Sequence, residues 1–348
     1  MPIKVLLVDD SPTARLVLAN IISSAPDMQL VGEATNGARA IRMVEELRPD
    51  VVLMDLIMPQ MDGLEATREI MHLWPTPIVM ISSGLDKNET TIAFEAVNAG
   101  AVSVLQKPGP PGNAAYTASV KEVLATLRIM SSVRVIRHLK PNGASARLPG
   151  VLEPVNVVNP GTCPEIVAIV SSTGGPQTLA TIITALPPTF SLPVVIVQHI
   201  TTDFVLPLVE WLGTVSKLPV RIAQAGECLV PGTVYFAPGG KHLQFASDHR
   251  VELADTPANV PHIPSGDVLL ASVARRYSAR AVGVVLTGMG SDGAKGLRAM
   301  YDAGAITIAQ NEESCVVFGM PKEAIALGAA RHTLPPGEIA KLLQQYTT

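Results

Sequence analysis

The chain lacks any apolar run long enough to cross a membrane. A membrane-spanning helix needs about 20 consecutive apolar residues, and no segment of the 348 residues reaches that length. The chain begins with a short apolar stretch that ends in two acids, so it also lacks the longer apolar stretch and small-residue cleavage site of a secretory signal. We therefore expect no membrane insertion and a cytoplasmic location.

Basic clusters and cysteine patterns are missing as well. Lysine and arginine form no block and the net charge is −4, whereas nucleic-acid-binding proteins normally carry a basic patch. No nucleic-acid partner is expected. Cys163, Cys228 and Cys315 lie far apart and show neither a CxxC pair nor the spacing of a metal site. This pattern favours reduced thiols in a cytoplasmic protein.

The sequence contains enough apolar residues to form a large hydrophobic core. Hydrophobic residues make up 47% of the chain, and its length suggests two or three domains. Residues 1–120 alternate short apolar runs with amphipathic segments, which predicts a five-stranded, doubly wound α/β domain of the flavodoxin-like type. The predicted strands are 5–8, 30–34, 51–54, 78–81 and 102–105. The predicted helices are 12–23, 38–47, 64–73 and 89–99, with a last helix over 114–138.

A second domain follows a break in this pattern. Residues 139–164 are rich in proline and glycine, so the helix and interdomain linker are assigned to 121–164. From 165 to 348 strands and helices alternate again, which predicts a doubly wound, mainly parallel α/β domain. A β-rich insert is expected within it, at 220–223, 234–237, 243–245 and 251–253.

Acidic residues stand at the predicted strand ends of the first domain. Asp9 and Asp10 end the first strand and Asp55 the third, while Ser82 and Lys107 end the fourth and fifth. Clustered carboxylates repel each other unless a hard cation such as Mg²⁺ neutralises them. A lysine and a hydroxyl nearby would hold phosphoryl oxygens, and one carboxylate could then accept a phosphoryl group. Any single Asp could instead cap a helix, but capping does not explain the paired Lys and Ser.

These residues resemble the motifs of a response-regulator receiver domain. The matching stretches are Val8-Asp9-Asp10-Ser11, Met54-Asp55-Leu56-Ile57-Met58-Pro59, Met61-Asp62-Gly63, Ser82 and Lys107-Pro108. The resemblance implies phosphorylation of Asp55 by a histidine kinase, Mg²⁺ at Asp9, Asp10 and Asp55, and phosphate contacts from Ser82 and Lys107. Many receivers carry an aromatic residue three positions before the lysine, where this chain has Val104.

Three polar side chains follow predicted strands of the second domain. Ser172 precedes two glycines and a helix start, His199 follows the next strand, and Asp292 lies in a glycine-rich stretch after a later strand. The strand ends of one parallel sheet converge, so the three can meet as nucleophile, base and orienting acid. Backbone N–H groups of Thr173 or Met289 could then stabilise an oxyanion.

Other interpretations of these residues stay open. The Ser172 turn could be a phosphate-binding loop at a helix N-terminus, a single His carries little information, and Asp292 could be a turn or cap residue. His242 and His262 each lie in a loop or turn and could also line a site.

The second domain resembles the catalytic domain of chemotaxis protein-glutamate methylesterases, the CheB family. The matching stretches are Ser171-Ser172-Thr173-Gly174-Gly175, Gln198-His199, Ala237-Pro238-Gly239 with His242, Pro264-Ser265-Gly266-Asp267, 286–293 and Val317-Phe318-Gly319-Met320-Pro321. The resemblance implies a Ser172–His199–Asp292 triad, no cofactor in this domain, and hydrolysis of glutamate methyl esters. It also implies deamidation of glutamines, with methyl-accepting chemoreceptor helices as the substrate.

Two other functions remain as alternatives. The chain could be a receiver-controlled esterase or amidase for small molecules, or a non-catalytic response regulator that acts by binding proteins. A DNA-binding output is the weakest alternative, because the second domain is too large and sheet-rich for a helix-turn-helix module.

Overall fold

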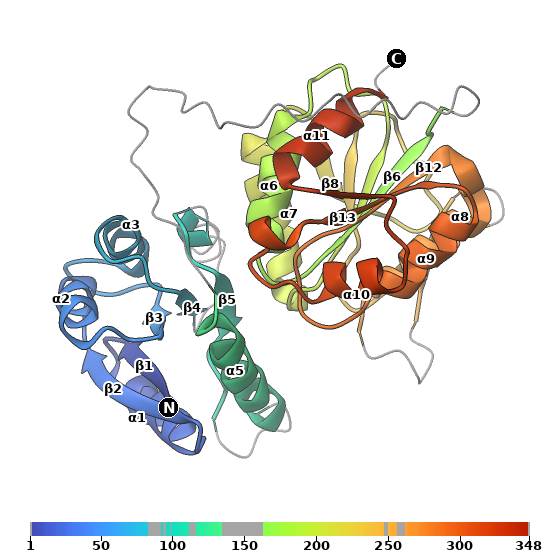
Figure 1. The fold of residues 1–348 in the computed structure, drawn as a ribbon. Helices are drawn as coiled ribbons and strands as arrows, with labels where there is room; N and C mark the ends of the chain where they lie inside the picture. Colours follow the sequence, from blue (N-terminus) through green and yellow to red (C-terminus); the bar gives the residue numbers. More distant parts are fainter. Residues whose placement is uncertain are drawn as a thin grey trace.

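The structure is a computed structural model that describes residues 2–82, 92, 95–97, 99–110, 116–133, 163–246, 250–255 and 262–346. Its described residues form two parallel sheets with helices packed against them, one in each half of the chain, and a separate two-stranded sheet in the second half (Figure 1). The described parts of residues 2–133 are called the N-terminal unit here, and those of residues 163–346 the C-terminal unit. No helix among the described residues has the length and apolarity that a bilayer span requires.

The N-terminal unit is a parallel five-stranded sheet in the order β2-β1-β3-β4-β5. Its strands are β1 (Ile3–Val8), β2 (Met28–Ala34), β3 (Val51–Asp55), β4 (Ile78–Ser82) and β5 (Ser103–Gln106). Its helices are α1 (Pro12–Ser23), α2 (Gly37–Leu47), α3 (Gly63–Leu73) and α5 (Tyr116–Met130). The apolar runs form strands because helices cover both faces of the sheet, and β3 and β4 are buried along their whole length.

The C-terminal unit is a seven-stranded parallel sheet in the order β14-β13-β12-β6-β7-β9-β8. Its strands are β6 (Ile166–Ser171), β7 (Val194–Gln198), β8 (Val220–Ile222), β9 (Val234–Phe236), β12 (Ala281–Val285), β13 (Ile306–Gln310) and β14 (His332–Leu334). The antiparallel pair β10 (His242–Phe245) and β11 (Val251–Ala254) lies outside this sheet.

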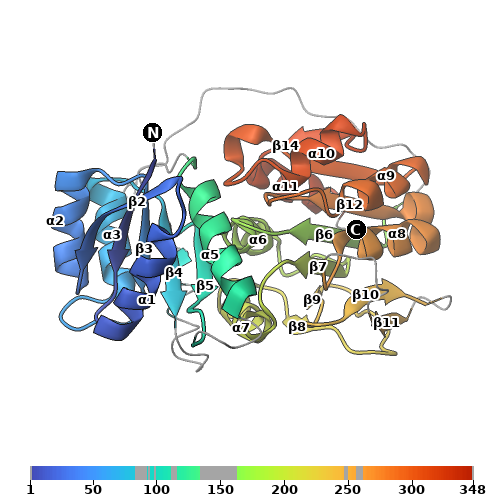
Figure 2. The same cartoon turned by 90° about the horizontal axis from the view of Figure 1, so that it is seen from below.

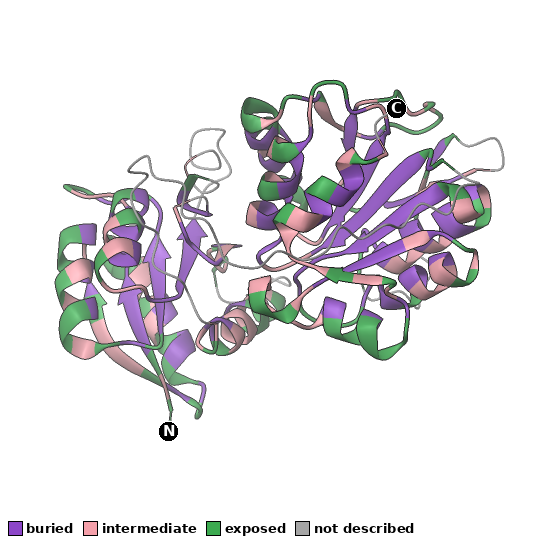
Figure 3. Ribbon diagram, turned by 45° about the horizontal axis from the view of Figure 1, so that its top comes forward, coloured by how far each residue is buried: buried purple, intermediate pink, exposed green. Residues whose placement is uncertain are grey.

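Helices cover the faces of the second sheet. They are α6 (Gly175–Ala185), α7 (Val205–Val215), α8 (Gly266–Tyr277), α9 (Ala294–Asp302), α10 (Met320–Ala326) and α11 (Pro336–Gln344), with 3₁₀ turns η1 (Thr202–Phe204), η2 (Ser278–Arg280) and η3 (Glu312–Ser314). Figure 3 shows the central strands of both sheets buried and the outward sides of the helices exposed.

Most of the predicted organisation is present. Both units have the predicted α/β architecture, and the first has the five predicted strands. The predicted β-rich insert is split: β8 and β9 extend the main parallel sheet, and only β10 and β11 form a separate antiparallel pair. The predicted helix 89–99 lies mostly outside the described residues, and so does the predicted linker 139–164, almost entirely.

One predicted boundary is wrong. The helix predicted over 114–138 ends at Met130. The hydroxyls of Ser131 and Ser132 donate to the backbone carbonyls of Arg128 and Ile129, at 2.8 and 2.7 Å. Serine side chains compete in this way for helical backbone groups, and a turn follows.

Each parallel sheet has a switch point, where successive strands begin to be added on the opposite side of the first strand. In the first sheet β1 lies between β2 and β3, and in the second β6 lies between β12 and β7. Ligands and reacting groups of open α/β sheets gather beyond the carboxyl ends of the strands at such points. The residues after β1 and β3, and after β6, β7 and β12, are therefore the places to search for sites.

The two units pack so that α5 and β5 of the first face the second. In Figure 2, α5 stands between the N-terminal sheet and the helices α6 and α7. The same arrangement places one face of the N-terminal unit against the carboxyl end of β6.

Candidate functional sites

The predicted acidic pocket is present in the N-terminal unit. Asp9 and Asp10 follow β1, Asp55 ends β3, and one carboxylate oxygen of each lies within 4.8 Å of the others. Asp9 and Asp55 are buried, whereas Asp10 is exposed. Lys107, just after β5, places its Nζ 2.8 Å from Asp9 Oδ2 and 2.9 Å from Asp55 Oδ2. Three strand ends thus bring three acids and one lysine together.

Burial makes Asp55 an unusual carboxyl group. Desolvation, with the neighbouring charge of Asp9, raises the pKa of Asp55 to about 6, against the opposing effect of Lys107. The pKa of Lys107 is raised despite its burial, because it donates hydrogen bonds to both acids. A set of carboxylate oxygens with one exposed member is the hard donor chemistry that Mg²⁺ prefers.

Ser82 also lies at this edge. It is the last residue of β4 and is buried, and its carbonyl oxygen accepts a 2.8 Å hydrogen bond from the Lys107 N–H. The backbone therefore ties the Ser82 and Lys107 positions together beside Asp55.

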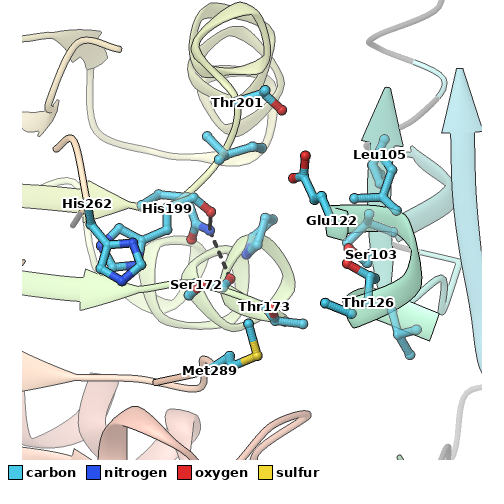
Figure 4. Close-up of a pocket in the computed structure, with 18 of the residues that line it drawn as sticks. Ser103, Leu105, Glu122, Thr126, Ser172, Thr173, His199, Thr201, His262 and Met289 are labelled. Atoms are coloured by element: carbon cyan, nitrogen blue, oxygen red, sulfur yellow. Dashed lines mark hydrogen bonds between the residues drawn. The ribbon is translucent and has the colours of Figure 1, made fainter. Parts of the chain in front are cut away.

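In the C-terminal unit, Ser172 lies on a tight turn between β6 and α6. The Ser172 N–H donates to the Thr287 carbonyl oxygen at 3.0 Å, and the Ser172 carbonyl oxygen accepts from Gly175 N at 2.8 Å. Gly288 lies so close that an added Cβ would come within 2.6 Å of Ser172 Cβ. Backbone hydrogen bonds fix the turn, and the side chain of Ser172 faces the space beyond the sheet (Figure 4).

Gln198 joins the turn to the next strand. Its side-chain oxygen accepts from Ser171 Oγ at 2.6 Å, and its Nε2 donates to the Ser172 carbonyl oxygen at 2.8 Å. The N–H of His199, which follows directly, donates to the Ser171 carbonyl oxygen at 2.9 Å. These bonds hold the backbone of His199 beside that of Ser172.

Asp292 contacts His199 across the sheet edge. His199 Nε2 lies 2.8 Å from Asp292 Oδ2, which leaves the Nδ1 of His199 as the nitrogen free for a proton transfer. Asp292 is 9% exposed. Its carboxylate also accepts hydrogen bonds from Ser265 Oγ, Gly266 N and Asp267 N, at 2.8, 2.6 and 3.0 Å.

These donors set the charge of Asp292. Burial alone would raise its pKa, but the hydrogen bonds from His199 and from the Asp267 and Gly266 N–H groups hold the pKa well below the ordinary value. Because the two N–H groups belong to the first turn of α8, the helix dipole also favours the negative charge. The carboxylate is therefore ionised, so the His199 Nε2 carries a proton and donates it.

The two ambiguous histidines lie on either side of this pair. His242, on β10, is buried behind it, and its Nδ1 accepts a 3.1 Å hydrogen bond from Ser265 N. His262 is exposed to the cleft and stacks on the ring of His199. The sequence pattern alone gives neither histidine a definite role. Ser265, Gly266 and Asp267 were not predicted as donors to Asp292, although a Ser-Gly-Asp segment at a helix start is typical of an N-cap.

The predicted oxyanion donors lie beside Ser172. Thr173 and Met289 line the same cleft as Ser172 and His199. Within the described part of the chain, the backbone N–H groups of Thr173 and Met289 donate to no protein group. They are available to a negatively charged oxygen at this place.

A cleft of about 410 Å³ lies above these residues, and both units line it. The C-terminal unit contributes Ser172, Thr173, Gly174, Pro176, Gln198, His199, Ile200, Thr201, His262, Ile263 and Met289. The N-terminal unit contributes Val97, Val102, Ser103, Val104, Leu105, Glu122, Ala125 and Thr126. Figure 4 shows Glu122, Ser103 and Thr126 directed at the cleft from β5 and α5, opposite Ser172 and Thr173.

Comparisons with known proteins agree with this arrangement. Residues 167–343 match the family described as CheB methylesterase, and residues 5–115 match the response regulator receiver domain. The chain belongs to the CheB methylesterase family. A protein-glutamate methylesterase/protein-glutamine glutaminase from Geobacter metallireducens is 44% identical over 98% of both chains. A protein of the same name from Paramagnetospirillum magneticum is 43% identical over 98% of this chain and 97% of its own.

A solved structure covers the second half. The CheB methylesterase catalytic domain of Thermotoga maritima is 40% identical, covers 52% of this chain and 98% of its own, and superposes with a TM-score of 0.51. The family resemblance and the receiver-plus-methylesterase architecture inferred from sequence are thereby confirmed. The roles of individual residues and the domain boundaries stay predictions.

The environment of Asp292 generates a prediction for pH-dependent stability. Its depressed pKa means that the carboxylate stabilises the fold at neutral pH, and that this stabilisation is lost as the pH falls below about 4. Asp292→Asn should therefore lower the free energy of unfolding by about 3–5 kcal/mol at pH 7 and by clearly less at pH 3. Urea denaturation of both proteins across this range measures the difference.

Asp302→Asn is the matched control. Asp302 forms an exposed ion pair with Arg298 on α9, and such pairs contribute little to stability. Its deficit should be small and nearly independent of pH. A deficit of Asp292→Asn that stayed constant from pH 7 to pH 3 would contradict the charge state assigned to Asp292.

Proposed function

We propose that this chain is a phosphorylation-controlled protein-glutamate methylesterase and protein-glutamine glutaminase that acts on chemoreceptors in the cytoplasm. The observation that carries the proposal is the buried Asp292 carboxylate hydrogen-bonded at 2.8 Å to His199, which lines the same cleft as Ser172. A hydroxyl alone is a poor nucleophile, and an imidazole held by a carboxylate is the group that activates it.

The chemistry follows from the assignment of the ring nitrogens. Ser172 Oγ forms a bond to the ester carbonyl carbon while its proton passes to Nδ1 of His199. The negative charge on the carbonyl oxygen is stabilised by the N–H groups of Thr173 and Met289. When the tetrahedral intermediate collapses, the bond to the methoxy oxygen breaks and His199 returns the proton, so methanol leaves.

Water completes the reaction. His199 takes a proton from water, which attacks the acyl-enzyme, and Ser172 is released together with a glutamate carboxylate. A glutamine amide passes through the same kind of tetrahedral intermediate and would release ammonia. Ser172 Oγ makes no hydrogen bond to His199 within the described residues, and catalytic hydrogen bonds of this type often form only when substrate is bound.

The substrate in this proposal is a receptor helix. The relatives named above are protein-glutamate methylesterases, and the cleft has exposed apolar side chains at its edge, Ile263 and Met289, at 44% and 49% exposed. Apolar rims of this kind suit a protein surface.

The N-terminal unit would serve as the switch. Asp55 is the proposed phosphoryl acceptor, a histidine kinase the donor, and Ser82 and Lys107 the groups that contact the phosphate. Asp9, Asp10 and Asp55 would hold Mg²⁺, which would neutralise charge at this site when bound. The clustering of their oxygens within 4.8 Å and the exposure of Asp10 support this assignment.

Coupling between the two sites rests on the shared cleft. Val104, Glu122, Ala125 and Thr126 of the N-terminal unit line the same cleft as Ser172, and in this proposal they restrict its access. Val104 lies on β5, close in sequence to Lys107, so a change at Asp55 can reach the cleft through one strand. We expect phosphorylation to loosen this contact and to admit the receptor helix.

Methanol release tests the activity. Wild-type protein and Ser172→Ala are compared on a methylated receptor cytoplasmic fragment, each with and without a small phosphodonor plus Mg²⁺. Wild type should release methanol, faster with the phosphodonor, whereas Ser172→Ala should lose at least about 10³-fold in rate because the nucleophile is gone. Release that persisted in Ser172→Ala would refute the nucleophile, and no release by phosphorylated wild type would favour a small-molecule ester or a binding function.

A second prediction concerns the covering contact. Thr126→Arg introduces a long charged side chain on the cleft side of α5, which should push the two units apart and raise methanol release without phosphodonor several-fold. Thr117→Arg, on the same helix but exposed and outside the cleft, is the matched control and should behave as wild type. Equal basal rates in all three proteins would show that the N-terminal unit does not restrict the site.

A further inference from the structure

An imidazole that the proposed mechanism does not use lies directly on the proposed base. The rings of His262 and His199 stack with centroids 4.8 Å apart and planes 18° from parallel (Figure 4). His262 comes from the segment that leads into α8, whereas His199 follows β7. The fold therefore brings together two histidines that are far apart in the sequence.

The other contacts of His199 do not prevent its imidazole ring from tilting. Its backbone is fixed to Ser171, and its Nε2 is fixed to Asp292 Oδ2 at 2.8 Å. A ring held at one atom can still tilt about that hydrogen bond. Such a tilt would move Nδ1, at the other side of the ring, away from the Ser172 hydroxyl. A flat side chain against one face of the ring opposes this motion, and stacked rings also attract each other.

Partial desolvation of its ring favours a neutral His262. The titratable side chains that line the cleft are His199, His262 and Glu122. Partial desolvation against the His199 ring, and then the charge of His199 when protonated, lower the pKa of His262, with Asp292 acting in the opposite direction. A lowered pKa favours the neutral form of His262 beside a protonated His199.

We propose that His262 is a positioning residue, whose ring packs against one face of His199 and holds Nδ1 in line with Ser172. This role of His262 depends on the proposed function in one respect only, namely that His199 is the base that activates Ser172. The segment that carries His262 continues into Ser265, Gly266 and Asp267, which donate to Asp292. The segment 262–267 thus holds His199 in two ways: His262 packs against the face of its ring, and residues 265–267 fix its hydrogen-bond partner Asp292.

Acylation of Ser172 by p-nitrophenyl acetate tests this without a receptor. The pre-steady-state burst gives the rate of acylation and the KM for wild type, His262→Ala and His262→Phe, with thermal unfolding of each to verify the fold. His332→Ala, on the edge strand β14 and outside the cleft, is the control. His262→Ala should slow acylation about three- to tenfold, the range that one aromatic stack contributes, with KM little changed.

The phenylalanine variant separates positioning from chemistry. It keeps a flat ring and lacks nitrogens, so it should acylate within about twofold of wild type, with the acid limb of its pH–rate profile unmoved. Two results would overturn the proposal: wild-type acylation by His262→Ala, or a folded His262→Phe as slow as His262→Ala, which would mean that a nitrogen of His262 takes part directly.

Failure of the proposed substrate gives a different result. If wild type released no methanol from a methylated receptor fragment but still showed a Ser172-dependent burst, slowed in His262→Ala and restored in His262→Phe, the positioning role would stand. Only the receptor substrate would then be refuted. A burst that did not depend on Ser172 would overturn both.

Discussion

The C-terminal site depends on one buried charge. Asp292 is 9% exposed, and an isolated carboxylate there would be costly, because water stabilises ions far better than a protein interior. The site meets this cost with donors from four residues: the His199 ring, the Ser265 hydroxyl and the first N–H groups of α8. The same bonds that keep the charge stable also fix the positions of β7, α8 and the segment before α9. Stability and catalytic geometry therefore rest on the same contacts.

The two units use one architectural rule for two purposes. In each, polar residues follow strands at the point where the strand order reverses, because the carboxyl ends of parallel strands meet there. In the N-terminal unit the rule gathers three acids and a lysine. In the C-terminal unit it gathers Ser172, His199 and Asp292. The units then face each other across a cleft, so the chemistry of the first can govern access to the second.

Much of this arrangement was predictable because its signals are local. Apolar runs and the polar residues directly after them predicted the strands, the acidic pocket and the Ser172, His199 and Asp292 positions. The parts that failed depend on tertiary context. The sequence of residues 220–237 does not show that β8 and β9 join the main sheet. The early end of α5 depends on the hydrogen bonds that the Ser131 and Ser132 hydroxyls form with helical carbonyl groups.

The surroundings of the site were equally hard to foresee. Ser265 and His262 act on residues far away in the sequence, and their spacing carries no sign of that contact. The shared cleft depends on how two folded units dock, which no periodicity encodes. Sequence patterns therefore identified the reacting groups, and the structure was needed to find the groups that support and cover them.

The central claim is that the N-terminal unit controls access to a nucleophilic Ser172. The most direct measurement is the rate at which a fluorophosphonate probe labels Ser172 in the full chain, with the labelled residue located by peptide mass spectrometry. Labelling at Ser172 should become faster when a phosphodonor and Mg²⁺ are added, and no such acceleration should occur in Asp55→Asn. Labelling at another residue, or an equal rate with and without the phosphodonor, would contradict this claim.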